Sequence, residues 1–516
     1  MSKRVYLSVV AAAVAATFAG QASAAFTNPP ITGAGASAVS NSLKHILLNT
    51  YCAPGVANAA TVTLYDNDTG LGGKGSVYRF QCTKNAVTAT GLTNDIDVSY
   101  DTSGGSWKGL TPFSPNLFSA AQQASPNPST YPVQTVDISN LAKCGAEKVN
   151  FNTTIEGTVY TINYYPACPT INLTSAPAFG MTDVDASLFV NSAENQPLVD
   201  STWLTGQTPK ALVTNFTLGT ELTGFPVTAF GMTFGIAASA QLYKAMQADQ
   251  SAAGLLPAAC VGLIETANPV ANLGCAPRIS RAQYRSIIQN GGGKFNTGVA
   301  NLFTNVVPGT GVSIEVARRD RGSGTQATSN AFFLGSGCIS ANTEAPDLNA
   351  SLPLNSTATY VVDYNFTTGS VQTALGKAAN VIGVISADND GNLGGGGFLR
   401  LDGVFPSNVN AANGIYDLWT EEQLHANPSI TGDVLTFVND LGAFNNAVEA
   451  ITAYAGPGVI NLTPESNAAV PTYPLTLIAA GQFKNGVGDA TGAPATWYYQ
   501  DNGSGQAAFC AGRVSY

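Results

Sequence analysis

Charged side chains and histidines are scarce in this chain. Only 10% of its 516 residues are Asp, Glu, Lys or Arg, and there are two histidines. Acidic residues outnumber basic ones by 32 to 22, which gives a formal net charge of −10. Nucleic acids and anionic membrane surfaces are bound through clustered Lys and Arg. The composition argues against both as partners, but not against a small anion, whose site is set by local dipoles.

Metal, nucleotide and hydrolase motifs are also missing. No Cys-x-x-Cys and no Cys/His cluster occurs, which argues against a zinc site, and no lysine follows the glycine-rich loops as in a P-loop. Neither His45 nor His425 has a visible Ser or Asp partner for a triad. The segment 388–392 resembles a calcium loop but has Leu399 where glutamate is needed, so we read it as a hairpin turn. We expect no cofactor, no metal and no catalytic residue.

The first 24 residues have the pattern of an export signal. Lys3 and Arg4 precede an apolar run, Val5 to Phe18, and residues 22–24 (Ala-Ser-Ala) have the small-x-small pattern of a cleavage site. No later stretch approaches the ~18–20 unbroken apolar residues of a membrane helix. We therefore assign 1–24 to a signal peptide and expect an exported protein, periplasmic or extracellular.

Eight cysteines in an exported chain indicate disulfides. Spacing alone does not fix their connectivity, but their order favours local pairs and leaves one long-range pair. The candidates are Cys52 with Cys82, Cys144 with Cys168, Cys260 with Cys275, and Cys338 with Cys510.

Strand-like and helix-like segments alternate, which favours an α/β fold. Helices are expected over Ser37–Asn49 and Ser239–Met246, and strands over Asp97–Tyr100, Phe230–Ile236, Ile314–Ala317 and Val381–Ser386. Asn/Thr/Pro/Ser-rich tracts separate them at about 53–95, 110–175, 246–278 and 340–375. We interpret these tracts as disulfide-pinned surface insertions, and Glu421 and Glu422 as the start of a polar helix.

Four loops combine glycine with hydroxyl or charged residues. Glycines let the backbone approach an anion, hydroxyls donate hydrogen bonds, and an arginine offers a planar fork. The loops are Thr32–Ser37 with Ser37 as an N-cap candidate, Tyr100–Ser106, Phe179–Asp183, and Arg318–Gln326, which leads into a helix-compatible stretch. Each one alone is also an ordinary turn, whereas the four together indicate a site for a small oxyanion.

In this order, the loops resemble those of the periplasmic phosphate-binding proteins of ABC importers, in the type 2 periplasmic-binding-protein superfamily. The resemblance runs from about Thr32 to about Trp419. It implies an α/β fold of two lobes with a ligand cleft between them, lobe one being 25–226 plus 417–516 and lobe two 227–416. It also implies phosphate as the ligand and an ABC permease as a partner. The implied ligand-binding residues are Ser37, Ala38, Thr102 and Asp183 from lobe one, and Arg319, Ser323, Gly324 and Thr325 from lobe two.

The chemistry of Arg319 and Asp183 also suits phosphate. Arg319 keeps its proton and matches two oxygens at once. An ionised Asp183 only accepts hydrogen bonds, so it repels a fully deprotonated anion and accepts the proton of hydrogen phosphate or arsenate. This arrangement predicts selection against sulfate.

Two departures from the family pattern leave the ligand open. Arg321 stands where many phosphate binders have an acidic residue, and Ala38 replaces a bulky one, so another oxyanion or a phosphorylated organic group stays an alternative. The large uncharged insertions also suit a cell-surface or secreted protein that uses the fold for adhesion, matrix contact or phosphate scavenging. A phosphate-ester hydrolase has little support, because no activated nucleophile is visible.

Overall fold

The computed structural model gives the arrangement of most of the chain between residues 30 and 445. The residues it describes are 26, 30–52, 62–69, 75–85, 89, 91–110, 133–155, 158–184, 187–190, 195, 227–265, 274–289, 314–319, 321–335, 360–365, 367–407, 410–411, 415–445, 459–461, 497–499 and 513–515. The predicted signal peptide and the Cys338–Cys510 pair lie outside these residues.

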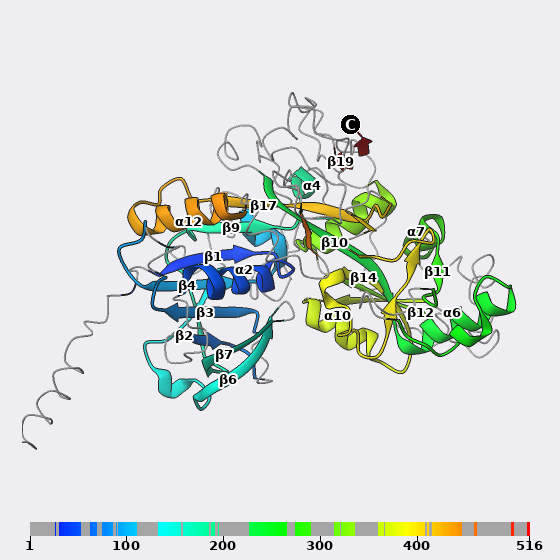
Figure 1. Ribbon diagram of the computed structural model, residues 1–516, viewed down its shortest axis with the longest axis horizontal. Coiled ribbons are helices and arrows are strands. Elements are labelled where there is room, and N and C mark those ends of the chain that lie inside the picture. The colour runs from blue at the N-terminus through cyan, green and yellow to red at the C-terminus, as the bar shows by residue number, and fades with distance from the viewer. Residues whose placement is uncertain are drawn as a thin grey trace, which may run out of the picture.

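One large mixed sheet organises the molecule (Figure 1). Its strand order is β13-β12-β14-β10-β17-β9-β1-β4-β3-β2-β7-β6, and β15 and β18 also pair with β10. The strands are β1 (Ile31–Gly35), β2 (Val62–Asp66), β3 (Val77–Cys82), β4 (Ile96–Asp101), β6 (Lys148–Ile155), β7 (Thr158–Tyr165), β9 (Phe179–Thr182), β10 (Val227–Ala238), β12 (Ile314–Arg319), β13 (Tyr360–Asn365), β14 (Asn380–Ser386), β15 (Gly397–Phe398), β17 (Trp419–Ala426) and β18 (Val459–Asn461).

Three short pairs of strands and a set of helices complete the described fold. The pairs are β5 (Gln134–Val136) with β8 (Thr170–Asn172), β11 (Arg278–Ile279) with β16 (Arg400–Leu401), and β19 (Trp497–Tyr499) with β20 (Arg513–Ser515). The α-helices are α2 (Ser40–Ile46), α4 (Ser187–Val190), α6 (Ala240–Ala252), α7 (Arg281–Gln289), α9 (Gly324–Ser329), α10 (Thr368–Leu375) and α12 (Gly432–Asn445). Two π-helical segments, η1 (Leu47–Tyr51) and η10 (Asn330–Leu334), extend α2 and α9. The short 3₁₀ helices are η3 (Gly105–Leu110), η5 (Leu141–Lys143), η8 (Ala258–Cys260) and η11 (Ala387–Asn389).

Two antiparallel strands, β10 and β17, connect the two halves of this sheet. The first part of β10 pairs with β17, from Val227 opposite Gln423 to Thr233 opposite Trp419. From Phe234 onward β10 pairs with β14 instead, while β17 pairs with β9 on its other side. Figure 1 shows β10 and β17 running between the two bodies. We call β9, β1, β4, β3, β2, β7 and β6 with α2 and α12 the first lobe, and β12, β13 and β14 with α6, α7, α9 and α10 the second lobe.

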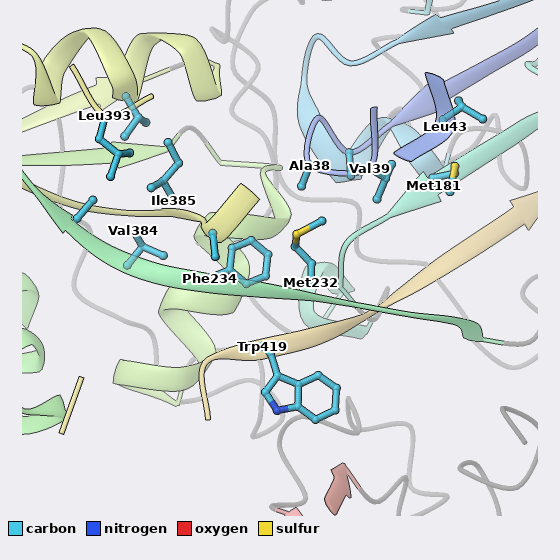
Figure 2. Close-up of a cluster of buried hydrophobic side chains, with 14 of the residues drawn as sticks. Ala38, Val39, Leu43, Met181, Met232, Phe234, Val384, Ile385, Leu393 and Trp419 are labelled. Atoms are coloured by element: carbon cyan, nitrogen blue, oxygen red, sulfur yellow. The ribbon is translucent and has the colours of Figure 1, made fainter. Parts of the chain in front are cut away.

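The apolar core is continuous between the two lobes, because side chains of β10 pack against residues of both lobes. Met232 and Phe234 of β10 are fully buried. Figure 2 shows them between side chains of the first lobe, such as Val39, and side chains of the second lobe, such as Ile385. Every residue of β14 is buried, as expected for a central strand covered on both faces.

The mixed α/β fold class and the predicted strands are confirmed, as are the three local disulfides. The bonds join Cys52 to Cys82, Cys144 to Cys168 and Cys260 to Cys275. The predicted helix over Ser239–Met246 is α6, and Ser239 caps it by accepting a hydrogen bond from the amide of Leu242. The lobe boundaries 226/227 and 416/417 stay a prediction.

Several of the expectations from the sequence are wrong. The tract 53–95 is not a surface insertion throughout, because it contains β2 and β3, whose Leu64 and Phe80 are buried. The tract 110–175 likewise contains β6 and β7 of the large sheet, and the tract 340–375 contains β13 and α10. Glu421 and Glu422 lie in β17 rather than in a helix. Segment 388–392 is not a hairpin, because β14 and β15 both pair with β10.

Among the described helices, none is long and apolar enough to cross a membrane.

Candidate functional site

The candidate site residues follow the carboxyl ends of parallel strands in both lobes. In the first lobe β1 is parallel to β4 and β9, and in the second β12 is parallel to β13 and β14. In open α/β sheets, ligands bind outside the carboxyl ends of the strands. Ser37 follows β1, Ser106 follows β4 and Asp183 follows β9, while Arg319 ends β12 and Thr368 follows β13.

Asp183 of the first lobe packs against the start of α9 in the second lobe. Ser106 Oγ donates a hydrogen bond to Asp183 Oδ1, and the Thr420 hydroxyl donates to the Asp183 carbonyl oxygen. A Cβ added to Gly324 would lie only 1.6 Å from Asp183 Oδ1 and 2.5 Å from Ser106 Oγ. This close approach requires glycine at 324.

The Asp183 carboxyl group is buried beside the positive charge of Arg319. Burial raises the pKa of Asp183, because it disfavours the charged form, while the hydrogen bond from Ser106 and the charge of Arg319 lower that pKa. Arg319 is itself only 3% exposed. Burial and the charge of Arg319 therefore act on the pKa of Asp183 in opposite directions.

A chain of three side chains also joins the lobes. Ser37 Oγ lies 3.0 Å from Thr368 Oγ1, and Arg319 Nη1 donates to the same Thr368 oxygen at 2.9 Å. The backbone amide of Arg319 donates to Gln326 Oε1 at 3.1 Å. The guanidinium and backbone of Arg319 are therefore both held by neutral partners.

Backbone groups of the two lobes are in direct contact. The Trp107 amide, in η3, donates to the Gly322 carbonyl oxygen at 2.9 Å, and the Gly322 amide donates to the Asn195 carbonyl oxygen at 2.8 Å. Gly105, whose φ is +69°, would place a Cβ 3.0 Å from Ser323 Cα. The glycine loop of the first lobe therefore lies against the arginine–glycine loop of the second.

A buried ion pair supports the first-lobe glycine loop. Lys108 Nζ lies 2.7 Å from Asp101 Oδ2, and the two side chains are 1% and 0% exposed. Lys108 also donates to Ser103 Oγ at 2.8 Å, and the Gln134 amide donates to Asp101 at 2.8 Å. This pair holds both ends of the 101–108 segment.

The structure places the predicted ligand residues as follows. Arg319, Ser323, Gly324 and Thr325 are buried at the end of β12 and the start of α9, and Asp183 lies against them. Ala38 is buried in the turn before α2. Thr102 is directed elsewhere, since its hydroxyl donates to the Ser76 carbonyl oxygen at 2.9 Å.

Ser37 is not the N-cap of the first helix. The helix begins at Ser40 with Val39 as its N-cap, because the Val39 carbonyl oxygen accepts the first helical hydrogen bond, from the Leu43 amide. The Ser37 carbonyl oxygen instead closes a turn with the Ser40 amide at 3.2 Å. The Ser37 side chain is thereby left to meet Thr368.

Sequence reasoning missed four residues of the site: Ser106, Lys108, Thr368 and Asp388. Ser106 stands in a loop that we singled out, but its pairing with Asp183 depends on β4 and β9 flanking β1. Asp388, in η11, was read as part of a turn. Burial raises the pKa of Asp388 to about 6, and the negative charge of Asp183 contributes in the same direction.

Comparisons with known proteins give weak likenesses. No protein-family model and no curated protein matches the chain. Among solved structures, it is similar to a candidate phosphate ABC transporter substrate-binding protein with bound phosphate from Clostridium perfringens, at a TM-score of 0.27 and 13% identity, covering 46% of this chain and 71% of that one. It is also similar to an ABC-type phosphate transport receptor from Vibrio cholerae, at a TM-score of 0.26 and 14% identity, covering 48% of this chain and 77% of that one. A third similar structure is PstS from Borrelia burgdorferi, at a TM-score of 0.26 and 13% identity, covering 46% of this chain and 72% of that one. Since the TM-scores are this low, the proposals below depend on the chain's own geometry.

Proposed function

We propose that this chain is an exported solute-binding protein that clamps a small oxyanion, hydrogen phosphate in particular, between its two lobes, for uptake or scavenging. The proposed lobes are 25–226 plus 417–516 and 227–416. The proposed contacts are Ser37, Ala38 and Asp183 on one side and Arg319, Ser323, Gly324 and Thr325 on the other. Ser106, which donates to Asp183, takes the place of the predicted ligand contact Thr102, whose hydroxyl donates to the Ser76 carbonyl oxygen. An ABC permease would be the partner in uptake.

The observation that carries this proposal is that buried Asp183 of one lobe lies against Gly324, at the start of α9 in the other lobe, with the positive charge of Arg319 near enough to lower the pKa of Asp183. Arg319 supplies a charge that matches two oxygens, and the backbone amides at the start of α9 add dipolar donors. Contacts from both lobes give the ligand more interactions in the closed arrangement than in an open one. Ligand binding therefore favours closure.

Asp183 gives the site its selectivity. Burial has the largest effect and raises the pKa of Asp183, while the hydrogen bond that Ser106 donates to the carboxylate lowers it. An ionised Asp183 accepts the proton of hydrogen phosphate or hydrogen arsenate. Sulfate has no proton to give near neutral pH and would be repelled.

Calorimetric titration of the anion-stripped, purified protein tests the proposal. We expect saturable 1:1 binding of phosphate and arsenate at fixed ionic strength, with sulfate weaker by about 100-fold or more, which corresponds to about 2.7 kcal/mol. Arg319→Ala should weaken phosphate binding by a similar factor. Asp183→Asn should reduce the difference in affinity between phosphate and sulfate, because the amide of asparagine can donate a hydrogen bond to sulfate.

Arg285→Ala is the matched control, since Arg285 is exposed on α7 in the same lobe. It should leave phosphate affinity within about twofold, because an exposed charge is largely screened. Absence of binding to all three oxyanions would refute the proposed function. Equal affinity for phosphate and sulfate would refute the role of Asp183.

A further inference from the structure

The hydroxyl of Thr368 touches both lobes at the candidate site. It accepts a hydrogen bond from Arg319 Nη1 at 2.9 Å and lies 3.0 Å from Ser37 Oγ. We propose that Thr368 is a positioning residue: it holds the Arg319 guanidinium ready for the oxyanion and, through Ser37, couples that orientation to contact between the lobes. This inference rests on the proposed function.

The fold itself brings Thr368 to Arg319. Strands β12 and β13 are parallel neighbours, and their last residues, Arg319 and Asn365, are paired in register. The chain then turns at Thr367, the N-cap of α10, and Thr368 is the first residue of that helix. The hydroxyl of Thr368 therefore meets the guanidinium at the shared carboxyl end of the two strands.

The start of α10 is held independently of Arg319. Thr367 Oγ1 accepts a hydrogen bond from the Ser370 amide at 3.1 Å, and the Thr367 amide donates to Ser370 Oγ at 2.9 Å. This reciprocal pair is a capping box, which fixes the first turn of the helix. Thr368 thus presents its hydroxyl from a fixed backbone.

The donors and acceptors of the three side chains are consistent with this role. A guanidinium has no acceptor, so Thr368 Oγ1 must accept from Arg319 and retains one donor and one lone pair for Ser37. Hydrogen bonds to a charged partner are the stronger kind. Since a long side chain loses rotamer freedom on binding, an Arg319 that is already oriented binds an oxyanion more tightly.

Thr368→Val removes the hydroxyl and keeps the shape of the side chain. We expect it to weaken binding of inorganic phosphate by about tenfold or more, because it removes a charge-assisted hydrogen bond. Thr368→Ser retains the hydroxyl and should restore affinity to within about threefold. Calorimetry gives the affinities, and the melting temperature of each variant shows whether it is folded.

Thr373→Val is the matched control on the same helix. Thr373 is exposed, and its hydroxyl donates to the Gly369 carbonyl oxygen at 2.9 Å. It should leave phosphate affinity unchanged. The proposal is overturned if Thr368→Val binds phosphate as tightly as the wild type, or if Thr373→Val weakens binding equally.

Small-angle X-ray scattering separates this inference from the proposed function. Because the contact between Ser37 and Thr368 joins the lobes through protein atoms alone, Thr368→Val should increase the radius of gyration of the ligand-free protein, while Thr368→Ser should not. If the wild type binds no oxyanion, the proposed function fails and the link between the lobes is judged by scattering alone. An unchanged radius in Thr368→Val would then overturn the link.

Discussion

The two lobes offer the candidate site opposite chemistry. The second lobe contributes a cation, Arg319, and the amides at the start of α9, whereas the first contributes a carboxylate, Asp183, and the hydroxyls of Ser37 and Ser106. The groups of one lobe alone would not both attract an oxyanion and distinguish a protonated oxyanion from an unprotonated one. Under the proposed function, dividing the two tasks between the lobes makes recognition depend on closure.

The lobes also differ in how their loops are held. In the first lobe the buried ion pair of Lys108 and Asp101 supports the glycine loop. In the second lobe neutral groups support the arginine loop, since Gln326 Oε1 accepts from the Arg319 amide and Gln326 Nε2 donates to Asn330 Oδ1 at 2.8 Å. We therefore expect the first loop to be more sensitive to loss of a single charge.

Gly324→Ala should have the largest effect on binding. Its Cβ would overlap the Asp183 carboxylate at 1.6 Å, so either the Asp183 side chain would have to leave its place or the lobes would have to move apart. We expect phosphate affinity to fall by about 100-fold or more, as measured by calorimetry. Gly369→Ala is the control, because its Cβ would meet only Thr367 Oγ1, at 3.7 Å. Wild-type affinity in Gly324→Ala would contradict the close approach of the lobes.

Lys108→Met should be the most destabilising of the charge changes. It leaves Asp101 buried without its cation, which typically costs about 3–5 kcal/mol of unfolding free energy. Lys377, by contrast, is 44% exposed in its ion pair with Glu315, so Lys377→Met should cost no more than about 1 kcal/mol. Urea denaturation measures both. Equal losses in the two variants would show that burial does not distinguish the pairs.

Asp388→Asn should have the smallest effect, visible as a change in pH dependence. The pKa of Asp388 is raised from 3.8 to about 6 in the folded protein, so the folded state binds its proton more tightly than the unfolded state does. Its contribution to stability is present below about pH 4 and is lost as the pH rises through about 6. We expect the wild type to lose about 1 kcal/mol more than Asp388→Asn over this interval, a value reduced for partial solvent screening. Parallel stability curves would contradict the raised pKa.

Much of the fold could be predicted because its signals are local. The apolar run of β14 and the close spacing of Cys260 and Cys275 are each contained in a short stretch of the sequence. Strands β2 and β3 could not be predicted, because their buried Leu64 and Phe80 lie within a tract rich in polar and small residues. Their place in the sheet depends on pairing with strands far along the chain.

Arg319 and Asp183 could be proposed from the sequence because each stands in a loop that carries its own chemistry. Thr368 could not, because only the parallel pairing of β12 and β13 brings it to Arg319. The N-cap prediction for Ser37 failed for a local reason, since a tight turn moved the helix start to Ser40. Residues that complete a site from another strand are the ones that sequence reasoning misses.

A crystal structure with bound arsenate tests the central claim most directly, because arsenic can be located by its anomalous scattering. The account predicts one arsenic peak between the Asp183 carboxylate and the Arg319 guanidinium, with the two lobes in contact around it. A peak elsewhere, or none at saturating arsenate, would contradict it.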